Sequence, residues 1–189
     1  FVFSRTSVGF DGLLNYYKGR NEVCDLAIEK AFMEHVGWNE LLPKPYFIDA
    51  DKTLFEHFRD VTREGITIAA PGFYAPQGRW VRLEPHDARL NEKIESFGYE
   101  GRRITNFEME SSALAGMASL MGHRAATICT IIAQRIEKFG LRLQAEELTP
   151  DHARPAGVLP QREQAIWLNT LMAAPHGVKR QSLSVPGVV

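Results

Sequence analysis

Residues 107–133 read FEMESSALAGMASLMGHRAATICTIIA, and this stretch decides the fold class. A helix is predicted over residues 107–121, because four apolar residues share one helical face: Leu114, Met117, Ala118 and Met121. Gly122 is expected to end that helix, since glycine readily takes the backbone conformation of a helix C-cap. Residues 124–133 are almost all apolar or threonine, which is typical of a central parallel strand covered on both faces.

The upstream sequence alternates in the same way between strand and helix patterns. Asn21 is expected to cap a helix that Gly37 ends. The patterns predict strands over residues 1–8, 46–48 and 65–70, and helices over residues 21–36 and 52–63. This order predicts an α/β fold, and a chain of 189 residues and 21.3 kDa is expected to form one domain.

Composition narrows the class of partner. The chain has 22 basic and 23 acidic residues, spread along its length, and a formal net charge of -1, so no electrostatic footprint for nucleic acid or for an anionic membrane stands out. No membrane-spanning run and no signal peptide pattern is visible in the sequence, so we expect a cytoplasmic protein with a small-molecule partner. Cys24 and Cys129 are expected to be reduced core thiols, and the histidines show no metal-ligand spacing.

The two ends of the chain differ from its middle. The sequence begins with Phe1 inside a strand pattern and without an initiator methionine, so we expect an upstream segment to be missing. Residues 140–189 are expected to form an atypical C-terminal segment, with a helix over residues 162–174 and a flexible Ser/Pro/Gly/Val tail.

The residues most suggestive of chemistry are Glu108 and Glu110, which flank Met109 at the predicted entry to a helix of small residues. One interpretation is structural, because carboxylates in the first turn complement the helix dipole. The other is functional, since an ionised carboxylate only accepts hydrogen bonds and therefore suits the adjacent hydroxyls of a sugar.

Three separated motifs resemble those of the nucleoside phosphorylase superfamily. Residues 106–111, NFEMES, resemble its ribose-binding signature, and residues 73–79, FYAPQGR, look like the uracil-recognition loop of its uridine phosphorylases. Residues 127–135, TICTIIAQR, are similar to its last core strand, which commonly ends in Asn-Arg. The resemblance spans residues 1–137 and implies a three-layer fold with a mixed central sheet flanked by helices, incomplete at the N-terminus, with residues 1–139 as its domain.

The resemblance assigns substrate binding to seven residues: Phe73, Gln77, Arg79, Glu108, Met109, Glu110 and Arg135. Its implied base contacts are Gln77 with O2 and N3-H of uracil, and Arg79 and Arg135 with O4, while Phe73 packs against the sugar or the base. Its implied sugar contacts are Met109 under the ribose and Glu110 on the 2′ and 3′ hydroxyls. Glu108 either assists Glu110 or orients the start of the helix.

The reaction that the resemblance implies is reversible phosphorolysis of a pyrimidine nucleoside, uridine plus phosphate giving uracil plus ribose 1-phosphate, in nucleoside salvage or catabolism. Arg79, Glu110 and Arg135 are its implied catalytic residues. Inorganic phosphate is the co-substrate, and the resemblance implies no metal, cofactor or protein nucleophile. It also implies a homo-oligomer, either a dimer or a trimer of dimers.

Two departures keep other functions open. The Gly-rich phosphate loop and the Arg-x-Gly-Thr segment of the superfamily do not occur in these 189 residues, which leaves a non-catalytic nucleoside-binding protein as the alternative. A purine nucleoside phosphorylase is less favoured, because the position where purine-specific relatives place an aspartate reads Gln134-Arg135. A nucleoside hydrolase of the same fold ranks third, because it would favour a different base loop.

Overall fold

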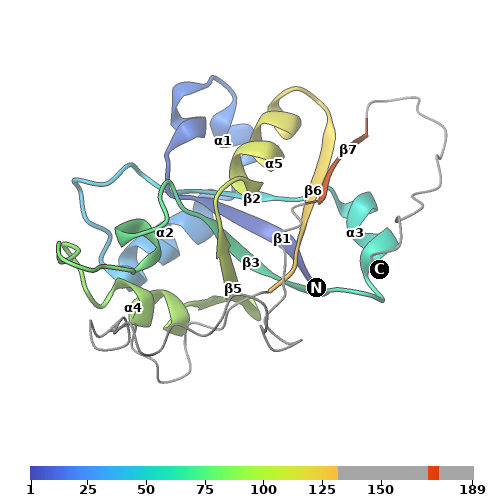
Figure 1. Cartoon of the computed structure of the whole chain (residues 1–189). Helices are drawn as coiled ribbons and strands as arrows, with labels where there is room; N and C mark the ends of the chain where they lie inside the picture. Colours follow the sequence, from blue (N-terminus) through green and yellow to red (C-terminus); the bar gives the residue numbers. More distant parts are fainter. Residues whose placement is uncertain (132–169, 175–189) are drawn as a thin grey trace, which may run out of the picture.

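The computed structural model describes residues 1–131 and 170–174, and its centre is a seven-stranded mixed sheet (Figure 1). The strands follow the order β4-β5-β3-β1-β6-β7, and β2 also pairs with β1. Their bounds are β1 Val2–Gly9, β2 Tyr46–Asp49, β3 Arg63–Ala69, β4 Gly98–Tyr99, β5 Arg102–Glu108, β6 Arg124–Cys129 and β7 Thr170–Ala174. The α/β class and the mixed sheet that the sequence predicted are therefore confirmed.

Three neighbouring strands, β1, β3 and β5, run parallel, so their carboxyl ends meet at one edge of the sheet. Gly9 pairs with Ala69, and Ala69 pairs with Glu108. Backbone bonds continue beyond the strands, since Phe10 N donates to Ala69 O at 3.1 Å and Ala70 N donates to Glu108 O at 2.9 Å. The loops that leave this edge are consequently held close together.

The second edge of β1 is shared by two antiparallel strands. Its carboxyl half pairs with β2, and its first residues pair with β6, where Val2 lies opposite Cys129. The prediction of a parallel strand over residues 124–133 is therefore wrong in direction, although β6 is mostly buried. A continuous apolar run indicates that both faces of a strand are buried. Burial alone does not distinguish parallel from antiparallel pairing.

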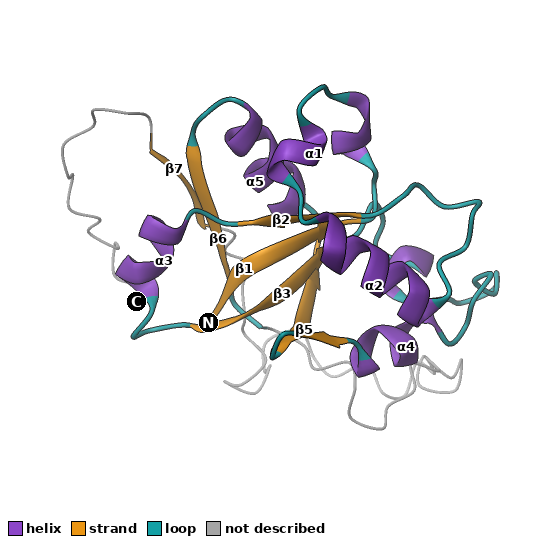
Figure 2. Ribbon diagram, turned by 180° about the vertical axis from the view of Figure 1, so that it is seen from behind, coloured by secondary structure: helices purple, strands orange, loops and turns teal. Residues whose placement is uncertain are grey.

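Helices cover both faces of the sheet (Figures 1 and 2). Helices α2, Leu26–Val36, and α4, Leu90–Ser96, pack on one face over a core that includes Val8, Ile66 and Ile68. Because β2 alternates its side chains, Phe47 joins that core, whereas Tyr46 and Ile48 face helix α5, Ser111–Leu120, on the other side. The remaining helices are α1, Arg20–Val23, and α3, Lys52–Phe58, with 3-10 turns at Leu13–Tyr16 and Ala75–Gln77.

Three predicted helix boundaries need correction. Asp25, not Asn21, caps α2, and Asn21 lies in the short α1. The helix predicted over residues 52–63 ends at Phe58, because β3 begins at Arg63. The helix predicted from Phe107 begins at Ser111, because β5 continues through Glu108.

The C-terminal part differs from its prediction where the structure describes it. Residues Thr170–Ala174 form β7, antiparallel to β6, so the helix predicted over residues 162–174 is wrong for its last five residues. Residues 162–169 lie outside the described residues, as does the predicted tail. Strand pairing with β6 overrides the local helical pattern of these residues.

The two cysteines belong to the interior of the protein. Cys24 and Cys129 are both free and buried, as predicted. Burial raises the pKa of the Cys24 thiol to about 11, so this thiol stays protonated at neutral pH.

Across residues 1–131 and 170–174, none of the helices has the length and apolar character needed to traverse a bilayer.

Candidate functional site

The loop that follows β3 forms the first half of the site. It leaves the sheet at Ala70 and closes into a 3-10 turn at Ala75–Gln77. Gly78 then takes a left-handed conformation, with φ of 72°, which returns the chain toward the turn. Gln77 is only 1% exposed, whereas Phe73 is 48% exposed. The amide of Gln77 therefore lies inside the loop, and the ring of Phe73 lies at its surface.

Arg79 closes this loop on itself. Its Nη1 donates to the backbone oxygen of Phe73 at 2.8 Å and to Oε1 of Gln77 at 2.7 Å. Its guanidinium also lies over the Phe73 ring, 3.7 Å from the ring centroid. Partial burial lowers the pKa of Arg79, but a guanidinium remains charged in proteins. Because it carries five N-H donors, Arg79 can hold the loop and still donate to a bound base.

Helix α4 supports the same loop from beneath. Asn91 Nδ2 donates to the backbone oxygen of Gln77 at 3.2 Å. No helix was predicted over residues 90–96, so this contact was missed by the sequence analysis. A short helix with few apolar residues has a weak periodic signal.

The segment that follows β5 forms the second half of the site. Glu108 is fully buried and caps α5, since its Oε2 accepts from the backbone nitrogens of Glu110 and Ser111 at 2.7 Å each. Its Oε1 accepts from the Ser111 hydroxyl at 2.6 Å. Burial raises the pKa of Glu108, although these hydrogen bonds favour the ionised form. Of the two roles considered for Glu108, the geometry favours orienting the helix start.

Met109 and Glu110 lie at the surface of this second half. Met109 is 43% exposed, and Glu110 is exposed at the N-cap of α5. Glu110 Oε2 accepts from the backbone nitrogen of Met109 at 3.2 Å. A carboxylate held at the mouth of the site can accept hydrogen bonds from a diol.

The sheet brings the two halves together. The loop after Ala69 and the segment after Glu108 start from paired residues of neighbouring parallel strands, joined by the Ala70 to Glu108 backbone bond. Crevices outside the carboxyl ends of parallel strands are common ligand sites in α/β proteins. A donor-rich loop and a carboxylate segment at one edge can bind a ligand that has hydrogen-bond acceptors at one end and a diol at the other.

A row of hydrogen-bonded polar side chains crosses β1, β3 and β5 near these strand ends, and it runs from the buried Ser4 and Thr67 to the exposed Thr105. Ser4 Oγ and Thr67 Oγ1 are 2.8 Å apart, and Thr67 Oγ1 donates to Asn106 Oδ1 at 2.9 Å. Thr105 Oγ1 donates to the same Asn106 oxygen at 2.9 Å. The row therefore fixes the orientation of the Asn106 amide, two residues before Glu108.

Comparison with known proteins shows the family of the chain. The family model described as the Phosphorylase superfamily matches residues 1–150, which is most of the chain. The chain belongs to the Phosphorylase superfamily.

Individual relatives of this Phosphorylase superfamily member are distant. Uridine phosphorylase 2 of Mus musculus is 26% identical over 167 residues, covering 78% of this chain and 49% of the relative. Uridine phosphorylase of Thermococcus kodakarensis is 35% identical over 83 residues, covering 40% of this chain and 27% of the relative. The chain thus spans about half, or less, of the length of the curated relatives it matches.

The fold also matches a solved structure. A nucleoside phosphorylase of Trypanosoma brucei, whose structure is described as showing uridine phosphorylase activity, is 23% identical with a TM-score of 0.62. The match covers 71% of this chain and 49% of that chain. At this identity the similarity establishes the shared fold.

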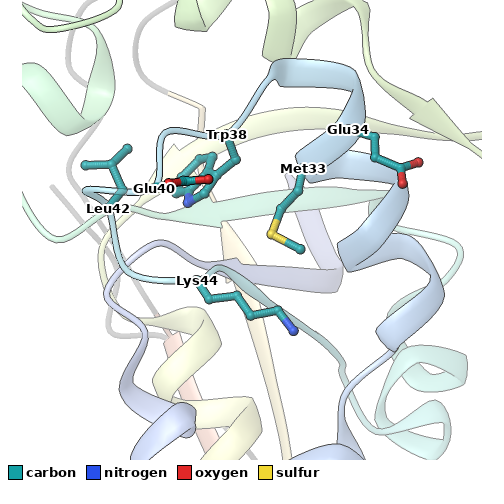
Figure 3. A pocket seen from close by; sticks show the side chains of 6 residues that line it. All are labelled: Met33, Glu34, Trp38, Glu40, Leu42 and Lys44. Atoms are coloured by element: carbon teal, nitrogen blue, oxygen red, sulfur yellow. The ribbon is translucent and has the colours of Figure 1, made fainter.

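Arg135 is the third of the predicted catalytic residues, and it lies outside the described residues of this superfamily member. A surface hollow of about 430 Å³ is formed at the end of α2 and the following loop (Figure 3). Its lining residues are Met33, Glu34, Trp38, Glu40, Leu42 and Lys44. Among the residues that the structure describes, no group of three or more His, Cys, Asp or Glu could hold a metal ion.

Proposed function

We propose that the protein catalyses reversible phosphorolysis of uridine to uracil and ribose 1-phosphate. The single observation that carries the proposal is the pairing of β3 with β5, because the loop with Gln77 and Arg79 and the segment with Met109 and Glu110 start from these paired strand ends. Membership of the Phosphorylase superfamily and the names of the two curated relatives support the same reaction.

In this proposal the two halves of the site divide the substrate between them. Gln77 and Arg79 bind the oxygen atoms of uracil, and Glu110 accepts hydrogen bonds from the 2′ and 3′ hydroxyls of the ribose, with Met109 beneath the sugar. Glu108 acts indirectly, because its carboxylate fixes the backbone that carries Glu110. Arg135 is proposed to add a second donor near O4.

The chemical step needs no protein nucleophile. A phosphate oxygen forms a bond to C1′ while the bond from C1′ to N1 of uracil breaks, and the electron pair leaves with the base. The departing uracil carries negative charge until N1 takes a proton. Arg79 stabilises that charge because its donors are already fixed by Phe73 and Gln77 and need no reorganisation.

The test measures uracil release from uridine by the purified protein, with and without phosphate. We expect release only when phosphate is present. Arg79→Ala and Glu110→Ala are each expected to lower kcat/KM about 100-fold, because each removes a fixed interaction with the transition state. Unchanged kinetics in both variants would show that these residues do not form the site.

A second candidate is nucleoside binding without turnover. It is favoured by the absence of the Gly-rich phosphate loop and of an Arg-x-Gly-Thr segment from the 189 residues. Uridine binding without uracil release under either condition would support this candidate. Equal release with and without phosphate would instead indicate a nucleoside hydrolase.

A further inference from the structure

Asn91 contacts the base-binding loop from a rigid support. It lies on α4, whose Ile94 and the following Phe97 are buried in the core against the sheet, with Leu90 packed beside them. From this helix, Asn91 Nδ2 reaches the backbone oxygen of Gln77 at 3.2 Å. A loop residue is thus tied to an element whose position the core determines.

The fit between Asn91 and the loop is close. A Cβ atom added to Gly78 would lie 1.9 Å from Asn91 Nδ2, and Gly78 has a φ of 72°. The loop can therefore approach Asn91 only because Gly78 has no side chain. Arg79 holds the Gln77 side chain from within the loop, and Asn91 holds the Gln77 backbone from outside it.

The oxygen atom of the Asn91 amide indicates why an amide is present at this position. Asn91 Oδ1 is buried and has no hydrogen-bond partner in the part of the chain that the structure describes. Such a buried acceptor destabilises the fold, and a leucine of similar shape would avoid that penalty. The amide is therefore explained by its donor, since the Gln77 carbonyl accepts a hydrogen bond from Asn91 Nδ2 that leucine could not supply.

We propose that Asn91 is a positioning residue for base recognition, which rests on the proposed function of the Gln77 and Arg79 loop. Its bond fixes the backbone of Gln77 and so sets the direction from which the Gln77 side chain meets the base. Glu110 projects from a different strand end, so its contacts with the ribose do not depend on Asn91.

The proposal predicts a loss of base discrimination with little change in stability. Asn91→Leu removes the unpaired oxygen, which favours folding, and also removes the donor to the Gln77 carbonyl, which disfavours it, so we expect only a small change in the free energy of unfolding. We expect about tenfold weaker uridine binding, as for the loss of one positioning hydrogen bond, and a smaller ratio of uridine to cytidine affinity. The ratio of uridine to 2′-deoxyuridine affinity should stay the same, because it reports Glu110.

The experiment compares Asn91→Leu and Asn91→Asp with Glu95→Ala, an exposed position on the same helix. Affinities for uridine, cytidine and 2′-deoxyuridine are measured by titration calorimetry, and stability by urea unfolding. Asn91→Asp should match Asn91→Leu in selectivity, because a carboxylate offers no donor to Gln77. The Glu95→Ala variant should bind like the unmodified protein.

Gln77→Ala separates this proposal from the proposed function. If the unmodified protein does not bind uridine, or Gln77→Ala leaves uridine affinity unchanged, the loop does not bind the base and both proposals fail. If Gln77→Ala weakens binding while both Asn91 variants keep the uridine to cytidine ratio, only the role of Asn91 is overturned. Equal losses for all three nucleosides, together with lower stability, would indicate a purely structural residue and also overturn it.

Discussion

At the residue scale, Glu108 combines burial with a hydrogen-bonded carboxyl group. Its carboxylate is fully buried, yet it accepts three hydrogen bonds from Glu110 and Ser111. Burial raises its pKa above the ordinary value of 4.5, so the folded protein holds this proton more tightly than the unfolded chain does. Stability contributed by the protonated form is therefore lost as the pH rises from about 4.5 through the raised pKa.

Glu108→Gln tests this linkage. A glutamine keeps an oxygen for the backbone nitrogens and adds a donor for the Ser111 hydroxyl, but it does not ionise. We expect the variant to gain stability relative to the unmodified protein as the pH rises from 4 to 7. Urea unfolding at several pH values measures the difference, and a relative gain for the unmodified protein over this range would contradict the prediction.

The positions of single site residues were predictable only where a motif carried them. Arg79 stands in a motif that follows a predicted strand, and Glu110 stands in a motif at the entry to a predicted helix. The strand before Glu110, β5, was not predicted, so the meeting of these two motifs at one edge of the sheet comes from the structure. Asn91 had no such signal, because its role depends on a contact across 14 residues that only the fold creates. Likewise, the sequence left open whether Glu108 binds or caps, since both roles need a carboxylate at the same place.

At the element scale, the start of α2 depends on Asp25. Its Oδ1 accepts from the backbone nitrogens of Ala27 at 3.1 Å and of Ile28 at 3.2 Å. Asp25→Ala is expected to lower the free energy of unfolding by about 1 kcal/mol, as is usual for the loss of an N-cap. Urea unfolding measures it, and Asp25→Asn is the control because it keeps the accepting oxygen. Equal losses in both variants would assign the effect to the charge of Asp25, which also lies 3.9 Å from Arg102.

Strands β1, β2, β3 and β6 and helices α2, α3 and α5 were predictable from the sequence. Helix α4 and strands β4 and β5 were not, nor were several boundaries and the direction of β6. Asn21 and Asp25 are both good capping residues, and local sequence does not decide between them. The direction of β6 depends on which edge of β1 is open, and that edge is shared with β2. These features are decided by pairing between segments far apart in the chain, which periodicity does not report.

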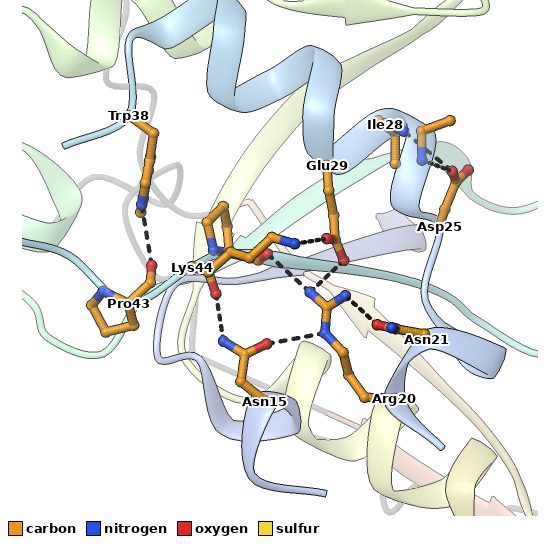
Figure 4. Close-up of polar contacts among 11 residues, drawn as sticks. Asn15, Arg20, Asn21, Asp25, Ile28, Glu29, Trp38, Pro43 and Lys44 are labelled. Carbon is orange, nitrogen blue, oxygen red and sulfur yellow. Dashed lines mark hydrogen bonds and ion pairs between the residues drawn. The ribbon is translucent and has the colours of Figure 1, made fainter. Parts of the chain in front are cut away.

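At the scale of the whole molecule, a buried charge cluster ties together segments that the sheet does not join (Figure 4). Glu29 of α2 is 1% exposed and lies 2.7 Å from Arg20 of α1 and 3.4 Å from Lys44 of the loop before β2. Arg20 also donates to Asn15 Oδ1 at 3.0 Å, and Asn15 donates to the Lys44 backbone oxygen at 2.8 Å. The cluster therefore joins four consecutive segments of residues 13–45.

Removing the acid from this cluster should destabilise the whole domain. Glu29→Ala leaves Arg20 buried without its counter-charge, and we expect the free energy of unfolding to fall by roughly 3 kcal/mol. Glu34→Ala on the same helix is the matched control, because its pair with Lys30 is 3.9 Å long and exposed. That control should change stability by no more than about 0.5 kcal/mol. Urea unfolding of both variants decides the matter, and similar small losses would mean that hydrophobic packing alone holds residues 13–45 in place.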